Sequence, residues 1–247
     1  MKKRPTQILL ALLILFAGVQ LKAQQSVTWS LPDWGYGSGN IFTGLMKPTA
    51  IGTVDESGNV EVPLKSDYLS EVKEQVAREN ADDSNKWKSA LLTLDKFYNC
   101  HTETVEIVNG DQPFTGLSTM GFFMLGNMEK EQYFGDVMPA SSMEFAEALR
   151  NPGSYSYKEG YNLDWYYLDE EASIKGTCTM ESVAVTMDET YMQTSSYDLD
   201  FKPGWNLVKY EIQELFTDRE GNTYIKNDRY SIIPEVPAEV GFQFFPK

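Results

Sequence analysis

Residues 205–233, WNLVKYEIQELFTDREGNTYIKNDRYSII, decide the fold of this chain. Two runs rich in β-branched and aromatic residues, 205–216 and 223–233, flank the turn Asp218-Arg219-Glu220-Gly221-Asn222. The turn formers and the glycine suit a short hairpin loop. The same chemistry recurs upstream, where Asp55-Glu56-Ser57-Gly58-Asn59 separates residues 51–54 from residues 60–64. The sequence therefore predicts two β-hairpins, and most of the remaining chain follows the same pattern.

Further short strands are predicted from β-branched and aromatic runs between turn signals. They cover residues 27–31, 104–108, 117–125, 163–168, 172–179, 183–187 and 241–245. Helical spacing interrupts the pattern in two places. Leu69, Val72 and Val76 recur within residues 66–98, and residues 141–144 form a capping-box pattern for a helix that ends before Pro152. The predicted fold class is mostly β: an antiparallel β-sandwich with a few short helices covering an end or a face.

The N-terminus predicts export. Lys2, Lys3 and Arg4 precede an apolar run over residues 8–19, and Ala23 offers a small residue for cleavage. The run has 12 residues, which is shorter than the roughly 20 that a membrane span needs. Residues 1–23 are therefore predicted to be a signal peptide. The mature chain is expected in the periplasm, on the cell surface or outside the cell, with no transmembrane segment.

Composition limits the partners of the mature chain. The full chain of 247 residues carries a formal net charge of −15. Removal of the signal peptide takes away four basic residues and no acidic one, which leaves 17 basic against 36 acidic residues. Such a surface repels nucleic acids, whose binding requires clustered Lys and Arg. The remaining partners are unidentified, with a glycan or an envelope protein as the two classes that fit.

Two domain arrangements fit the pattern of predicted elements. In the first, residues 24–247 form a single mostly-β domain with a helical insertion near residues 66–98. In the second, a small N-terminal β module over residues 24–98 precedes a larger β domain over residues 99–247. The length of the mature chain accommodates either arrangement.

Parts of the chain resemble known secreted modules. The segment that begins Ala50-Ile51-Gly52-Thr53-Val54-Asp55 and runs to Leu64 resembles a hairpin of transthyretin-like and carboxypeptidase-regulatory-like modules. Residues 174–178, 197–199 and 202–206 are similar to secreted Bacteroidetes-type proteins of unknown function, as is the signal that ends in Ala23-Gln24-Gln25. The resemblance implies an envelope or extracellular β-rich protein, and it carries no known activity or functional residue.

Cys100 and Cys178 are the two cysteines of the chain. Export places them in an oxidising compartment, where disulfides form and persist. We predict one intramolecular disulfide between them; the alternative is a pair of buried free thiols.

The sequence carries no catalytic signature. His101 is the single histidine, so multi-histidine metal sites are absent, and no metal site or cofactor is predicted. Cys100 and His101 are adjacent, and adjacent residues of a strand point to opposite faces, so they do not form a nucleophile and base. Paired carboxylates remain open, with Asp198 and Asp200 two residues apart.

Aromatic residues give the most specific functional prediction. Trp34 and Tyr36 lie in a glycine-rich loop, and Trp165 and Tyr167 share one face of a predicted strand. Exposed rings stack against sugar rings, so these four residues are the candidate ligand-binding residues. Core packing is the alternative role for such rings. The primary functional hypothesis is an exported, non-enzymatic binding or structural protein of the bacterial envelope with an unidentified ligand. The alternatives are a carbohydrate-binding β-sandwich that uses surface aromatics and a carbohydrate-active hydrolase with two carboxylates.

Overall fold

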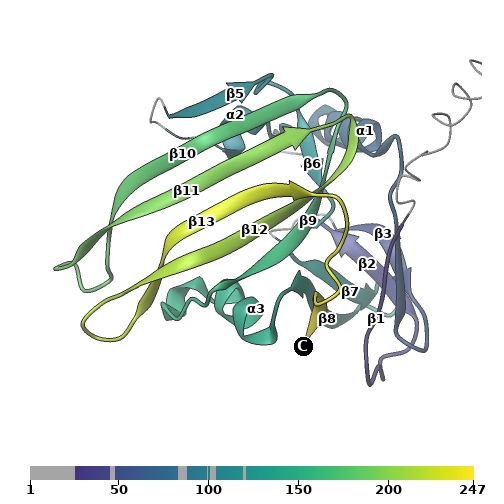
Figure 1. The fold of residues 1–247 in the computed structure, drawn as a ribbon. Coiled ribbons are helices and arrows are strands. Elements are labelled where there is room, and N and C mark those ends of the chain that lie inside the picture. The colour runs from purple at the N-terminus through teal and green to yellow at the C-terminus, as the bar shows by residue number, and fades with distance from the viewer. Residues whose placement is uncertain (1–25, 45–47, 83–87, 99, 101–103, 119–120) are drawn as a thin grey trace, which may run out of the picture.

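The computed structural model describes residues 26–44, 48–82, 88–98, 100, 104–118 and 121–247. The predicted signal peptide and His101 lie outside these ranges. Strands account for 53% of the described residues and helices for 14%. Figure 1 shows how these elements are arranged. The strands are β1 (Ser26–Ser30), β2 (Gly39–Thr43), β3 (Thr49–Val54), β4 (Asn59–Pro63), β5 (Val105–Val108), β6 (Phe114–Gly116), β7 (Phe123–Asn127), β8 (Gln132–Ala140), β9 (Gly160–Leu168), β10 (Ala172–Val183), β11 (Thr190–Phe201), β12 (Gly204–Thr217), β13 (Thr223–Ile233) and β14 (Gly241–Pro246). The helices are α1 (Tyr68–Ala81), α2 (Leu94–Phe97), α3 (Met143–Arg150) and a 3-10 turn (Pro152–Ser154).

All of these strands join one sheet, in the order β1-β4-β3-β2-β7-β8-β9-β12-β13-β11-β10-β5. In addition, β14 pairs with β8 and β6 pairs with β9. The pairing is antiparallel except between β11 and β13, which run parallel. The strands β8 and β9 meet through the single residue pair Ala140 and Asn162. The sheet therefore bends at this point into a smaller part that ends at β1 and a larger part that ends at β5.

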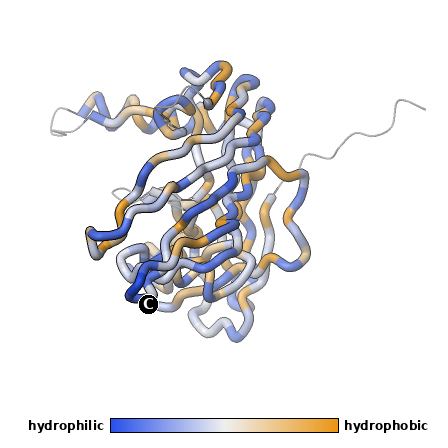
Figure 2. Tube along the Cα trace, turned by 60° about the vertical axis from the view of Figure 1, so that its left-hand side comes forward, coloured by the Kyte–Doolittle hydropathy of each residue, from blue (hydrophilic) through white to orange (hydrophobic). Residues whose placement is uncertain are grey.

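The two parts of the sheet fold toward each other around the main hydrophobic core. This core takes Val27 and Phe123 from the smaller part and Trp165 and Leu207 from the larger part. The Trp205 indole Nε1 of β12 donates a hydrogen bond of 2.9 Å to the Lys65 carbonyl, just after β4, although five strands lie between β4 and β12 in the sheet. Figure 2 shows hydrophobic and hydrophilic positions following one another along the strands, as this packing requires. The predicted mostly-β, antiparallel fold with short helices is confirmed, and its two layers belong to one continuous sheet.

Both predicted hairpin turns are present and share one geometry. In the β3–β4 turn, the Asp55 carboxylate accepts hydrogen bonds from the Ser57 and Asn59 backbone N–H groups. In the β12–β13 turn, the Asp218 carboxylate accepts the corresponding hydrogen bonds from the Glu220 and Asn222 backbone N–H groups. Gly58 and Gly221 both adopt positive φ, at 81° and 89°. Each turn is therefore formed by five consecutive residues, with Asp in the first position, Gly in the fourth and Asn in the fifth.

Three predicted elements differ from the structure. Residues 117–125 are not one strand, because positive φ at Gly121 separates β6 from β7. Of the predicted strand over 183–187, Val183 is the last residue of β10, and residues 184–187 lie in the turn between β10 and β11, with Met187 at a φ of 63°. Residues 88–92 are not helical, and the Asn80 side chain bonds both the N–H and the carbonyl of Ser89.

The helix after residue 141 is confirmed, with a different N-cap from the one that the capping box implies. The Ser142 hydroxyl accepts from the Phe145 backbone N–H at 3.1 Å, so Ser142 caps α3. The Ser141 hydroxyl instead accepts from the Tyr161 N–H of β9 at 3.0 Å. Ser141 therefore ties the helix to the larger part of the sheet.

Candidate functional site

The loop between β1 and β2 presents two of the four predicted ligand-binding residues at the surface. Positive φ at Asp33 and Gly37 bends this loop tightly, and the Trp34 indole Nε1 donates a hydrogen bond of 2.8 Å to the Gly37 carbonyl. The Trp34 ring is half-buried, whereas Tyr36 is 44% exposed. The loop therefore fixes one ring and leaves the other facing solvent.

Trp34 and Tyr36 belong to a cluster of four rings that we call the aromatic platform, completed by Phe134 of β8 and Phe244 of β14. The ring centroids of Trp34 and Tyr36 lie 5.0 Å apart. Phe134 lies 5.6 Å from Trp34, and Phe244 lies 5.7 Å from Tyr36. These separations suit edge-to-face and tilted packing of aromatic rings. The platform is therefore a rigid apolar patch held by three separate segments of the chain.

Trp165 and Tyr167, the other two predicted ligand-binding residues, lie in the main core. Trp165 is 1% exposed and Tyr167 is 8% exposed. Strand β9 lies inside the sheet, and the smaller part of the sheet covers the face that carries these two rings. A ligand at the surface does not reach them, so the structure brings together only Trp34 and Tyr36 of the four.

The aromatic platform is a surface rather than a cavity. An open, mostly apolar pocket in the described part of the chain is lined by Phe42, Met124, Met128 and Tyr133, among others, and it does not include Trp34 or Tyr36. Two further pockets, beside α1 and beside β1, do not include them either. Tyr36 is the exposed ring of the platform, Trp34 and Phe244 are half-buried, and Phe134 is 3% exposed. The platform therefore offers chiefly the Tyr36 ring for stacking and does not enclose a ligand.

The opposite face of the larger part of the sheet carries a second aromatic cluster, which the sequence analysis missed. We call it the tyrosine face. It consists of Tyr98, just after α2, Tyr166 of β9, Tyr197 of β11, Tyr210 of β12 and Tyr230 of β13, together with the carboxylate of Asp228. Alternation along the strand could have revealed part of this cluster, because Asp228 and Tyr230 are two residues apart in β13 and therefore point to the same face.

Ring contacts connect the tyrosine face across three strands. The Tyr210 and Tyr230 centroids lie 4.7 Å apart, and the Tyr197 and Tyr230 rings stack at 5.5 Å. Tyr98 packs edge-on against Tyr197 at 5.7 Å and against Tyr230 at 5.5 Å. Tyr98 is buried, whereas Tyr197, Tyr210 and Tyr230 remain partly exposed. Tyr98 thus covers the rings of Tyr197 and Tyr230, while Tyr210 packs against the buried cluster that includes Phe145 and Ile212 and keeps part of its surface accessible.

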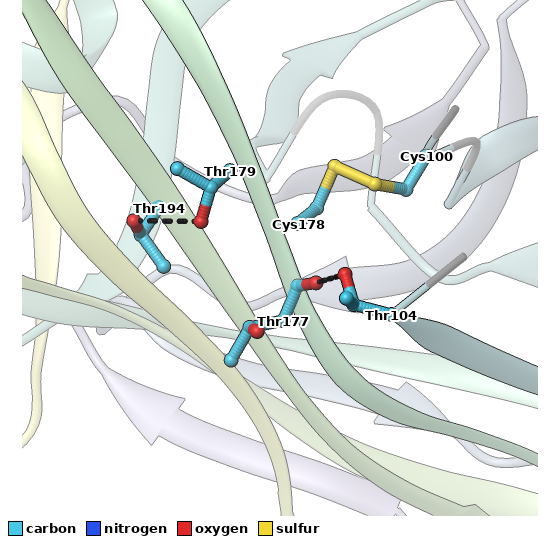
Figure 3. The surroundings of a disulfide bond; sticks show 6 residues. All are labelled: Cys100, Thr104, Thr177, Cys178, Thr179 and Thr194. Carbon is cyan, nitrogen blue, oxygen red and sulfur yellow. Dashed lines mark hydrogen bonds between the residues drawn. A yellow bond between two sulfur atoms is a disulfide. The ribbon is translucent and has the colours of Figure 1, made fainter. Parts of the chain in front are cut away.

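The predicted disulfide between Cys100 and Cys178 is confirmed, and it holds the segment that carries Tyr98 in place over the tyrosine face. Figure 3 shows Cys178 on β10 bonded to Cys100, while the next residue, Thr179, turns to the other face and bonds Thr194 at 3.1 Å. The Thr104 hydroxyl also donates to the Thr177 carbonyl of β10. The bond therefore fastens the segment that follows Tyr98 onto the face that carries Tyr197.

Two carboxylates on this side of the sheet titrate unusually. Burial raises the pKa of Asp228 to about 6. Burial also raises the pKa of Asp164 to about 6, although hydrogen bonds from the Ser118 hydroxyl and the Trp165 backbone N–H lower it in part. Desolvation disfavours the charged form of a carboxyl group, and such groups gather at functional sites.

We expect Asp164 to make the folded protein less stable as pH rises from about 4 to about 6. The folded state binds its proton more tightly than the unfolded state, so this stabilisation is complete below the ordinary pKa of 3.8 and is lost through the folded value of about 6. The loss amounts to about 3 kcal/mol. In urea unfolding across this pH window, the free energy of unfolding should fall less steeply with pH in Asp164→Asn than in the wild type. Part of the fall should remain, because Asp228 titrates in the same range.

Asp198→Asn is the matched control for this prediction. Hydrogen bonding and charge from Lys175 lower the pKa of Asp198, so its stabilisation is lost only as pH falls below about 4. This variant should keep the wild-type slope between about pH 4 and about pH 6. An Asp164→Asn slope equal to that of the wild type would contradict the assignment.

Asp164 and Asp228 do not form a glycosidase pair. Asp164 pairs with Val208 of β12, and Asp228 pairs with Ile212 of the same strand, from opposite sides. The Cα atoms of Asp164 and Asp228 are about 16 Å apart, because they are offset by four residues along the strand direction and by two strand spacings across the sheet. Glycosidase carboxyl groups lie roughly 5–10 Å apart. The sequence candidates Asp198 and Asp200 are both bound to Lys175, at 2.6 and 2.7 Å.

The described ranges contain no group of three or more His, Cys, Asp or Glu side chains arranged to hold a metal ion. No helix in them combines the length and apolar character of a membrane span.

No protein-family model, curated protein or solved structure matches the chain. The resemblance to secreted Bacteroidetes-type proteins stays a prediction. Function is inferred from the two aromatic surfaces and the groups around them.

Proposed function

We propose that this chain is an exported, non-enzymatic binding protein of the bacterial envelope and that the aromatic platform is its binding surface. The observation that carries the proposal is the position of Trp34 and Tyr36 on a fixed loop, packed against Phe134 and Phe244, with the Tyr36 ring 44% exposed. Large exposed apolar groups are costly to keep, and where they gather they mark interaction sites. Export is supported by the basic and apolar N-terminal pattern and agrees with the disulfide.

Sugar rings are the ligand class that this surface favours. A pyranose offers a flat apolar face of C–H groups, which stacks on an aromatic ring, while its hydroxyl groups stay hydrated. The platform is open rather than enclosed, so it suits one unit of a long glycan better than a small molecule, which pockets bury on most sides. A hydrolytic role is not favoured, because the desolvated carboxylates are too far apart.

We expect Tyr36→Ala to weaken glycan binding at least tenfold while the melting temperature of the protein changes by no more than about 2 °C. Truncating an exposed residue away from a cap or a buried network changes stability little, whereas loss of a stacking ring removes the contact with the sugar. The measurement is a thermal-shift screen of residues 24–247 against soluble glycans, followed by calorimetric titration of any glycan that stabilises the protein.

Tyr133→Ala is the matched control, since Tyr133 is 40% exposed and lies outside the platform. It should bind the glycan as the wild type does. Trp34→Ala should lower both binding and stability, because the Trp34 ring packs on Phe134 and Phe244. Absence of any glycan-induced shift, or equal binding by Tyr36→Ala, would remove the carbohydrate proposal.

A further inference from the structure

The tyrosine face presents three partly exposed rings side by side on neighbouring strands. Tyr210 of β12 pairs with Tyr230 of β13, and Tyr230 pairs with Tyr197 of β11. Paired residues of adjacent strands point to the same face of a sheet, so the three rings form a continuous row. Each ring keeps part of its surface accessible to solvent.

Asp228 lies beside this row without a partner for one of its oxygens. It precedes Tyr230 by two residues on β13, so its side chain points to the same face. Asp228 is 4% exposed, and its Oδ1 has no hydrogen-bond partner among the described residues. Burial, and after it the charge of Asp228, raises the pKa of the Tyr210 and Tyr230 hydroxyl groups. Burial raises the pKa of Asp228, and hydrogen bonds from the Ser195 and Gln193 side chains to its carboxylate lower it in part.

The described protein does not neutralise Asp228 with a cation of its own. Lys226, two residues earlier on β13, binds Glu214 at 2.5 Å. Arg229 points to the opposite face and binds Asp198 at 2.9 Å. A buried carboxylate oxygen without a donor or a counter-charge is costly to maintain, and native proteins keep few of them. A bound group that supplies positive charge would remove this cost.

We propose that Asp228 and the rings of Tyr197, Tyr210 and Tyr230 form a binding site for a small organic cation of the quaternary ammonium class. The face of an aromatic ring carries negative electrostatic potential and attracts a weakly hydrated cation, and the carboxylate supplies the opposing full charge. Calcium does not fit, because it requires six to eight oxygen ligands and this site offers one carboxylate. The net charge of −15 also draws cations toward the protein.

Calorimetric titration with choline and with its uncharged isostere 3,3-dimethylbutan-1-ol tests the proposal. The two probes have the same shape and differ in the charge at one atom. We expect choline to bind saturably and at least ten times more tightly than the alcohol. Asp228→Asn, which keeps the size of the side chain and removes its charge, should weaken choline binding at least tenfold and leave binding of the alcohol unchanged.

Asp198→Asn is the control for overall charge, since Asp198 lies on the opposite face and binds Lys175 and Arg229. It should keep choline affinity within about twofold of the wild type. A second pair of variants tests the rings independently of Asp228. Tyr210→Leu should weaken choline binding at least tenfold, whereas Tyr210→Phe keeps the ring and should retain most of the affinity.

Three results would overturn the proposal: no saturable choline binding by the folded protein, equal affinity for choline and the alcohol, or unchanged affinity in Asp228→Asn. If Asp228→Asn does not fold, equal affinities of Tyr210→Phe and Tyr210→Leu would overturn it. Tyr36→Ala should bind choline normally, so failure at the tyrosine face and failure at the aromatic platform are separate outcomes.

Discussion

Replacement of both Cys100 and Cys178 with serine is expected to lower the free energy of unfolding by about 2–5 kcal/mol. The bond joins residues 78 positions apart, and closing a loop of this length restricts the unfolded chain by about 4.5 kcal/mol in the chain-entropy description. Urea unfolding of the wild type and the double variant measures the difference.

The loss should extend to the tyrosine face. Tyr98 lies two residues before Cys100 and packs against Tyr197 and Tyr230, so release of the bond frees the buried ring that covers one end of the row. We expect a weaker near-ultraviolet circular dichroism signal from tyrosine in the double variant, with the far-ultraviolet signal of the sheet retained. Wild-type protein treated with dithiothreitol is the control and should show the same stability as the double variant. A loss below about 1 kcal/mol would mean that the bond restricts the unfolded chain little.

The two hairpin turns were predicted correctly because they are local. The turns at Asp55–Asn59 and Asp218–Asn222 form from five consecutive residues whose own side chains bond the backbone, so no distant contact is needed. The start of α3 was displaced by one residue, because the choice between Ser141 and Ser142 depends on a bond from Tyr161 of β9. Side-chain contacts also bear on residues 88–92, which lie in the predicted helical region 66–98 and bond to Asn80 instead of forming a helix.

The candidate sites were predicted only in part for the same reason. Alternation correctly placed Trp165 and Tyr167 on one face of β9, but it does not say which face meets the core. That depends on the fold of the smaller part of the sheet over β9. The tyrosine face needs the parallel pairing of β11 with β13, a long-range contact that no local pattern encodes. Trp34 and Tyr36 were found because a short loop rich in glycine leaves their rings near the surface.

We expect Trp165→Ala to lower the free energy of unfolding by about 3–5 kcal/mol. Trp165 is 1% exposed, and its ring lies 6.2 Å from that of Phe123 across the main core. Removal of the indole takes away its contacts with both parts of the sheet and leaves a cavity that rigid strands fill poorly. Urea unfolding measures the change, and Tyr36→Ala, which truncates a ring at the surface, should cost less than about 1 kcal/mol.

Trp165→Phe separates packing from hydrogen bonding at the same position. The Trp165 indole Nε1 is buried without a hydrogen-bond partner among the described residues, so the folded protein bears a desolvation cost for that N–H group. Phenylalanine removes the N–H group and keeps most of the apolar volume, so we expect Trp165→Phe to cost less than half as much as Trp165→Ala. Equal losses in the two variants would mean that the shape of the indole, rather than its apolar area, holds the two parts of the sheet together. In that case the bend between β8 and β9 would depend on how the Trp165 ring fits between the two parts of the sheet more than on the apolar area that the ring buries.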